Sequence, residues 1–161
     1  MARTQDGEGI QDLAQTVTRC KRKERQFAAV THVRIDHLGI AVTSVDNALR
    51  FYEEQLGLRV SLREVVEKEK VNVAMLPVGE PRIGLLEASA PDSVIAKFVE
   101  RRGEGLHHVA LKVPDLPAAV ERLRTAGARI LNEPRAGAGG QLYVFVHPSS
   151  TGGVLLELIQ A

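Results

Sequence analysis

The chain has 161 residues, of which 44% are hydrophobic and 25% charged, and its formal net charge is +1. This composition is that of one globular domain, and the near-neutral charge argues against a nucleic-acid partner. No apolar run reaches the roughly 20 residues that a membrane-spanning helix needs, so no membrane contact is expected. Cys20 is the only cysteine, which excludes an internal disulfide and a cysteine-based zinc cluster and favours a reducing, cytoplasmic location.

The first 33 residues show no periodic apolar pattern. A basic cluster spans residues 19–25, without the apolar segment of a secretory signal. Asp6, Glu8 and Asp12 also disagree with a transit peptide, which is usually poor in acidic residues. We therefore expect a mobile or partly helical tail over residues 1–33, with a basic arm that contacts a partner as the alternative.

A regular pattern begins at residue 35. Residues 35–42 alternate, with apolar side chains on one face and His37 on the other, as in a half-buried strand. A helix follows, which Asp46 can cap and Gly57 can end. Three more strands are expected at 59–66, 70–77 and 82–88. The order of elements is βαβββ.

The same order recurs in the second half of the chain. Residues 106–113 alternate as 35–42 do, and His108 matches His37 at a constant offset of 71 positions. A helix ended by Gly127 and three strands, near 129–132, 141–147 and 153–159, complete the repeat.

The repeat predicts an α+β fold with one domain over residues 34–161. Its parts are a first βαβββ module (34–90), a linker helix (91–105) and a second βαβββ module (106–161). Two such modules side by side can curl their strands into an open, cup-shaped mixed sheet with the helices outside. The strand face away from the helices then lines a cleft.

Three polar side chains are expected in that cleft. His37 and His108 lie on strand faces opposite to the apolar residues that pack on the helices. Glu157 is the only acid in its apolar strand, and a buried carboxylate needs a partner to offset its desolvation. Two imidazoles and a carboxylate form a divalent-metal ligand set with open positions for water or substrate. The sequence therefore predicts a metal site at these three residues.

The repeat also indicates where a fourth ligand is missing. The counterpart of Glu157 in the first module is Gly84, which has no side chain, and strand alternation places the nearby Glu87 on the other face. The same alternation places His107 toward the helices. Asp36 precedes a candidate ligand and could equally be an edge or capping residue. The glycine-rich loops at 137–140 and 149–153 are either plain hairpin loops or a backbone cradle for a substrate oxygen.

From residue 35 onward the chain resembles the methylmalonyl-CoA epimerase family of the vicinal-oxygen-chelate superfamily, to which glyoxalases and bleomycin-resistance proteins also belong. The segments that carry the resemblance are 35–42, 91–98, 102–110 and 147–158. The resemblance implies that His37, His108 and Glu157 bind a divalent metal, Co²⁺ first, with Mn²⁺, Zn²⁺, Ni²⁺ or Fe²⁺ as alternatives. It also implies that a glutamate or glutamine supplies a fourth ligand in relatives where this chain has Gly84.

The implied activity is that of an isomerase acting on an acyl-CoA partner, within a homodimer. In methylmalonyl-CoA the C2 hydrogen lies between a thioester carbonyl and a carboxylate, so its removal builds charge that a metal can stabilise. By resemblance Glu157 is both a ligand and a candidate base, and the second acid is not identified. Three alternatives stay open: a glyoxalase-type lyase, an extradiol-type dioxygenase using two histidines and one carboxylate, and a non-catalytic binding protein.

Overall fold

The computed structural model describes residues 32–161. The expected N-terminal tail, 1–33, lies outside this range except for its last two residues. Within the described range, no helix is long and apolar enough to cross a membrane.

The first module runs from the central strand to the edge of the sheet and back. Its elements are β1 (Arg34–Val42), α2 (Val45–Leu49), the π-helical segment η1 (Arg50–Gln55), β2 (Leu62–Val66), β3 (Val71–Pro77) and β4 (Arg82–Ala88). Ser44, rather than Asp46, caps α2, because its side chain accepts a hydrogen bond from the Asn47 amide. Asp46 instead pairs with Arg63 at 2.6 Å.

The second module follows α3 (Val94–Arg102). Its elements are β5 (Gly105–Val113), α4 (Leu116–Thr125), β6 (Arg135–Ala136), the 3-10 turns η2 (Ala138–Gly140) and η3 (Pro148–Ser150), β7 (Leu142–Val146) and β8 (Leu156–Gln160). The strand expected at 129–132 is wrong, since only a single bridge joins Ile130 to Val146. Backbone hydrogen bonds of 2.8 Å join Leu131 N to Phe145 O and His147 N to Arg129 O. The side chain of Asn132 then accepts from the Phe145 amide at 2.8 Å.

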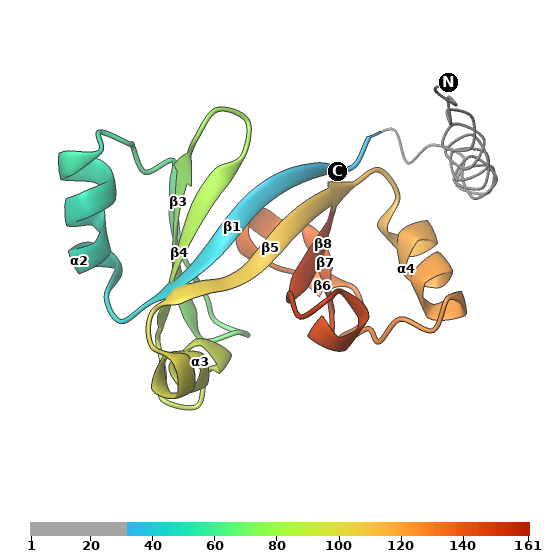
Figure 1. The fold of residues 1–161 in the computed structure, drawn as a ribbon. Coiled ribbons are helices and arrows are strands. Elements are labelled where there is room, and N and C mark those ends of the chain that lie inside the picture. The colour runs from blue at the N-terminus through green and yellow to red at the C-terminus, as the bar shows by residue number, and fades with distance from the viewer. Residues whose placement is uncertain (1–31) are drawn as a thin grey trace, which may run out of the picture. The chain divides into compact units, whose positions relative to one another are not determined.

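All eight strands form one mixed sheet in the order β2-β3-β4-β1-β5-β8-β7-β6. The strands β1 and β5 pair antiparallel at its centre, and each pairs in parallel with the last strand of its own module. Figure 1 shows these two strands running across the middle, with α2 and α4 on opposite outer sides. The expected α+β fold, with two βαβββ modules and an open curled sheet, is confirmed.

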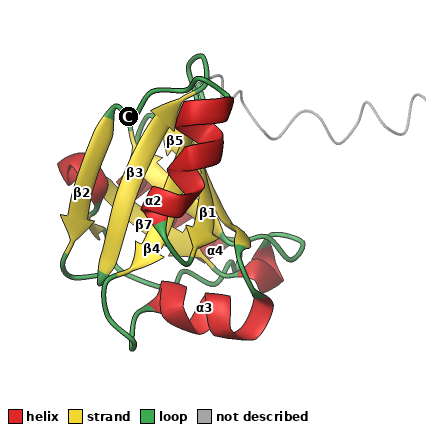
Figure 2. Cartoon of the chain, turned by 90° about the vertical axis from the view of Figure 1, so that its left-hand side faces the viewer, coloured by secondary structure: helices red, strands yellow, loops and turns green. Residues whose placement is uncertain are grey.

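Alternation along the strands divides the core into an outer and an inner part. On the outer side of the first module, Val45 and Leu49 of α2 pack with Leu76 and Leu85, and α2 covers this face in Figure 2. The inner side chains of β3 and β4 pack with Ile95 of α3 instead. The second module repeats the outer arrangement with α4. The inner face of the sheet is thus left free to line a site.

Two β-bulges interrupt the pairing of β1 with β5. The register leaves Asp36 as an extra residue between the pairs Ile35–Leu111 and His37–Ala110. It likewise leaves His107 extra on β5, beside the pair Gly39–His108. A bulge breaks strict alternation and re-aims side chains. The bulged residues are 71 positions apart, like the histidines that follow them, so the repeat extends to this irregularity.

Candidate active site

The three predicted ligands meet on the inner face of the sheet. The Nε2 atoms of His37 and His108 lie 3.0 Å apart, and Glu157 Oε2 lies 3.0 Å from His108 Nε2 and 3.4 Å from His37 Nε2. His37 and His108 are each 5% exposed and Glu157 9%. One ligand atom from each residue lies within 4.8 Å of the others, which is the spacing of a metal site. We call these residues the His–His–Glu cluster.

Asp36 holds His37 in the orientation that a ligand needs. The Nδ1–H of His37 donates to Asp36 Oδ2 at 2.8 Å, so the other ring nitrogen, Nε2, is turned toward the cluster. Asp36 also pairs with Arg82 and, at 3.0 Å, with Lys112. Burial alone would raise the pKa of Asp36, but these hydrogen bonds and charges lower it well below its usual value. Asp36 is thus a buried carboxylate behind the site, and its interpretation as an edge or capping residue is wrong.

His107 orients His108 as Asp36 orients His37. Their Nδ1 atoms lie 2.9 Å apart, and the His107 ring also packs on Phe98 of α3 at 5.0 Å. Burial, followed by the neighbouring His108, lowers the pKa of His107 to about 4, so its ring is neutral. A neutral His107 can accept from His108 Nδ1–H, which turns His108 Nε2 toward the cluster. His107 does face a helix as expected, but it also contacts His108, because the bulge breaks the strict alternation of the strand.

Small residues make room for both histidine rings. Gly39 lies opposite His108, and a Cβ at this position would be 2.3 Å from His108 Cε1, so only glycine leaves the ring its place. Ala110 lies opposite His37. Positions 39 and 110 are also 71 apart, so the repeat itself signalled this feature, which sequence reasoning missed.

Gly84 borders the cluster as the repeat indicated. A Cβ built there would lie 3.4 Å from His37 Cδ2 and 3.1 Å from Met75 Sδ. A longer side chain from this position would therefore reach toward His37. Glu87 serves the other face, where its carboxylate accepts from the Val45 amide at 2.7 Å and so holds the start of α2.

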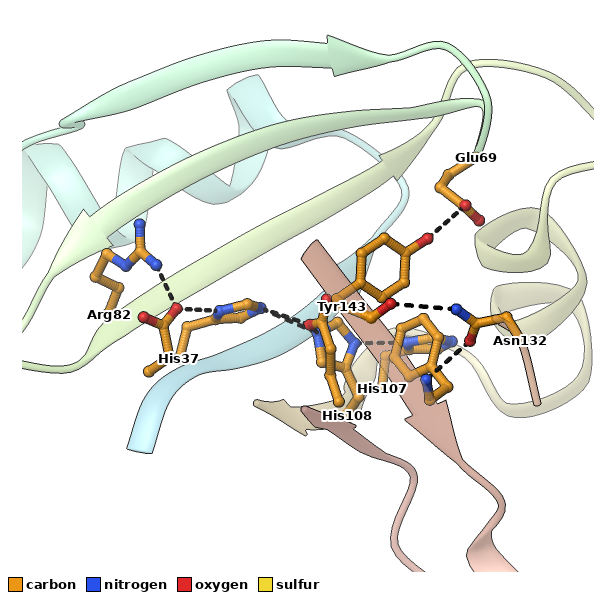
Figure 3. Close-up of polar contacts among 10 residues, drawn as sticks. His37, Glu69, Arg82, His107, His108, Asn132 and Tyr143 are labelled. Atoms are coloured by element: carbon orange, nitrogen blue, oxygen red, sulfur yellow. Dashed lines mark hydrogen bonds and ion pairs between the residues drawn. The ribbon is translucent and has the colours of Figure 1, made fainter. Parts of the chain in front are cut away.

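A cavity of about 90 Å³ lies over the cluster. Most of its wall is apolar, and the remaining polar side chains of the wall include Glu69 and Tyr143, which the sequence did not single out. Figure 3 shows Tyr143 beside the histidines with its hydroxyl directed to Glu69. A larger groove of about 490 Å³ shares His107 and His108 with this cavity. Lys97, Arg101 and Arg102 of α3 line that groove.

The chemistry of the cluster fits a divalent ion. Burial opposes ionisation of Glu157, but hydrogen bonds with His108 and His37 outweigh it and lower its pKa to about 2. The same contacts, together with Asp36, raise the pKa of His37 against the effect of burial. A divalent ion would displace the protons that these three side chains share and bind the carboxylate and the two imidazole nitrogens. Each imidazole is already held in place by a hydrogen bond at its other nitrogen.

The profile of the glyoxalase/bleomycin resistance protein/dioxygenase superfamily matches residues 36–145. The chain belongs to this superfamily. That membership confirms the resemblance and agrees with the curled sheet described above.

Among its relatives in this superfamily, the Bacillus subtilis protein YqjC, which is uncharacterized, is 40% identical over 79% of this chain and 91% of its own. Human mitochondrial methylmalonyl-CoA epimerase is 36% identical over 80% of this chain and 74% of its own. A solved structure of Streptomyces coelicolor methylmalonyl-CoA epimerase, a variant in complex with 2-nitronate-propionyl-CoA, is 38% identical with a TM-score of 0.77. It aligns with 80% of this chain and 96% of its own length.

Proposed function

We propose that this superfamily member is an isomerase that interconverts the two C2 configurations of methylmalonyl-CoA. The observation that carries the proposal is the convergence of His37, His108 and Glu157 in one cavity, in a chain similar to methylmalonyl-CoA epimerases over most of its length. We propose all three side chains as ligands of a divalent ion, with Co²⁺ as the first choice. An ion bound there would polarise the thioester oxygen of the substrate as a Lewis acid.

Glu157 can also act as a base. Its Oε2 makes both contacts to the histidines, so Oε1 is the oxygen left to accept the C2 proton. The low pKa of Glu157 keeps the carboxylate ionised at neutral pH. Much of the cavity wall is apolar, and an apolar surrounding strengthens the electrostatic interactions around the reacting carbon.

The larger groove supports an acyl-CoA substrate. Lys97, Arg101 and Arg102 supply positive charge that suits the phosphates of coenzyme A. Leu106 and Val154, which are 56% and 40% exposed, line the same groove and suit the pantetheine arm. Because the groove shares His107 and His108 with the cavity, an arm lying in it would deliver its thioester to the cluster. A homodimer and a cytoplasmic location stay predictions.

A second candidate is an Fe²⁺-dependent dioxygenase. The observation that favours it is Gly84, because two histidines and one carboxylate form the facial triad of non-haem Fe²⁺ oxygenases. This enzyme would consume oxygen with an aromatic diol, whereas the epimerase would need no oxygen.

Deuterium uptake at C2 of methylmalonyl-CoA in D₂O tests the proposal. We expect Co²⁺-loaded protein to exchange the C2 hydrogen and a chelator to abolish the exchange. His108→Ala is expected to lose it as well, while His32→Ala, an exposed histidine outside the site, retains it. A folded, metal-loaded protein that exchanges nothing would refute the proposal, and oxygen consumption with Fe²⁺ and a catechol would favour the dioxygenase.

Gly84→Glu tests whether the lack of a fourth protein ligand limits the affinity of the site for a divalent ion. The backbone at Gly84 has no positive φ and the nearest obstacle is the flexible end of Met75, so the substitution is sterically accessible. We expect about tenfold tighter Co²⁺ binding by titration calorimetry, which corresponds to about 1.4 kcal/mol. Gly84→Leu adds similar bulk without a ligand atom and is the control. Equal affinity of the Glu and Leu variants would show that position 84 does not reach the ion.

A further inference from the structure

A second polar group lies across the cavity from the His–His–Glu cluster. Tyr143 of β7 is 3% exposed, and its hydroxyl donates to Glu69 Oε1 at 2.6 Å. Arg135 Nε donates to the same hydroxyl at 2.8 Å and its Nη2 lies 2.7 Å from Glu69 Oε1. Glu69 lies in the turn between β2 and β3, so the bridge joins the two arms of the curled sheet while the cluster lies on the central strands.

Epimerisation needs two proton-transfer groups because the proton leaves one face of C2 and returns to the other. The titratable side chains that line the cavity, within the part of the chain described, are His37, Glu69, His107, His108, Tyr143 and Glu157. Three of them form the cluster, and His107 is occupied with His108. The remaining two, Glu69 and Tyr143, are hydrogen-bonded to each other.

We infer, given the proposed epimerase function, that Tyr143 and Glu69 form the second acid–base group, on the face of C2 opposite Glu157. Tyr143 is the catalytic residue because its hydroxyl is the group that meets the substrate, and Glu69 is the proton store behind it. The neighbouring Arg135 fixes both oxygens in place.

The transfer balances without a free phenolate. In one direction the C2–H bond breaks, its electron pair stays on the substrate and delocalises into the thioester, and the proton bonds to Tyr143 Oη. At the same time the original hydroxyl proton of Tyr143 passes to Glu69 Oε1. In the other direction Tyr143 gives its proton to C2 and takes one from protonated Glu69. Burial, then the Glu69 carboxylate, raises the pKa of Tyr143, which agrees with a hydroxyl that stays protonated between turnovers.

The position of Glu69 suits a proton store. Its side chain is 20% exposed, so protons on the carboxylate can exchange with solvent while Tyr143 remains buried. Gly137 lets the loop before β7 pass close to the Tyr143 ring, because a Cβ at this position would lie 2.8 Å from the ring. The ring packs edge-on against Phe145 at 5.4 Å, and Phe145 packs in turn on His108 at 5.5 Å.

The test follows C2 exchange in D₂O separately for the (R) and (S) forms of methylmalonyl-CoA with the Co²⁺-loaded protein. Tyr143→Phe keeps the ring and removes the proton, and Glu69→Gln keeps a hydrogen-bond acceptor for Tyr143 but stores no proton. For both variants we expect a loss of epimerisation of about 100-fold or more, the usual contribution of one acid–base group. Exchange without inversion is expected to continue for the one enantiomer whose hydrogen faces Glu157.

This asymmetry separates a catalytic from a structural role, because a merely misplaced substrate would lose exchange equally in both enantiomers. Tyr52→Phe, at the protein's other tyrosine, is the matched control and retains full activity. Co²⁺ affinity is expected to be unchanged in all three variants. Full epimerisation by Tyr143→Phe, or equal loss of exchange for both enantiomers, would overturn this inference alone. A wild type that exchanges neither enantiomer would overturn the proposed function together with it.

Discussion

Two small residues, Gly39 and Ala110, determine where the rings of the two site histidines can lie. Gly39 and Ala110 occupy equivalent positions of the two modules, and each lies opposite the histidine of the other module. Removing side-chain volume on one strand thus creates the space for an imidazole on its neighbour. The proposed metal site would depend on this packing as much as on the ligands themselves, since a ligand must be held near its productive geometry.

Gly39→Ala is therefore expected to disable the site while leaving the ligands in the sequence. The new Cβ would lie 2.3 to 2.7 Å from three atoms of the His108 ring, so the ring must move away and Nε2 leaves the cluster. We expect Co²⁺ affinity to fall at least 100-fold, the upper range seen when the support of a ligand is removed. Titration calorimetry measures this.

Gly84→Ala is the control for that change. Its Cβ meets nothing closer than Met75 Sδ at 3.1 Å, and methionine can shift, so the affinity should stay near that of the wild type. Equal affinity of the two alanine variants would show that His108 contributes little to ion binding.

At the scale of elements, periodicity was sufficient for most strands and helices, though not for the strand expected at 129–132. Alternation over residues 35–42 and 106–113 and the repeated apolar pattern predicted the two central strands and the face of His37 and His108. It could not predict the bulges at Asp36 and His107, because a bulge is an exception to the alternation that locates side chains. The contact of His107 with His108 was missed for this reason.

The contacts between distant elements were also beyond the sequence. Glu69 lies in a turn and Tyr143 in a strand 74 positions later, and no local pattern relates them. They meet because the sheet curls until its two arms approach each other. The Gly139 amide also donates to Glu64 Oε1 at 2.9 Å. The loop of residues 137–140, which precedes β7, therefore contacts β2 as well. Such contacts follow from curvature, which depends on the whole sheet.

The bridge between the arms has a signature in alkaline titration. Because the folded state raises the pKa of Tyr143 above the ordinary 10.0, its neutral form contributes stability in full below pH 10.0, and this contribution is lost as the pH rises further. The phenolate absorbance of Tyr143 should therefore rise only above pH 10.0. Subtracting the absorbance of Tyr143→Phe from that of the wild type isolates this rise. A difference signal that reaches half its height at or below pH 10.0 in folded protein would show that the bridge between Tyr143 and Glu69 does not form.

At the scale of the whole domain, the site joins the two modules. His37 belongs to the first module, while His108 and Glu157 belong to the second. In the structure the modules are held together chiefly by the pairing of β1 with β5. An ion that binds all three side chains would add a link between the modules close to this pairing, so ion binding is coupled to the stability of the entire domain and not of one half.

That coupling predicts a thermal shift that depends on ligands from both modules. At a free Co²⁺ concentration 100 times the Kd, binding to the folded state adds about 2.7 kcal/mol, which raises the Tm of a domain of this size by about 10 °C. The transition should remain single, because loss of either module releases the ion. His37→Ala and His108→Ala each remove a ligand from a different module, and both are expected to abolish most of the shift. Mg²⁺, which prefers oxygen ligands, should produce little shift in any of these proteins. A shift of equal size in His37→Ala and the wild type would mean that the ion binds elsewhere and that the two modules are not linked through it.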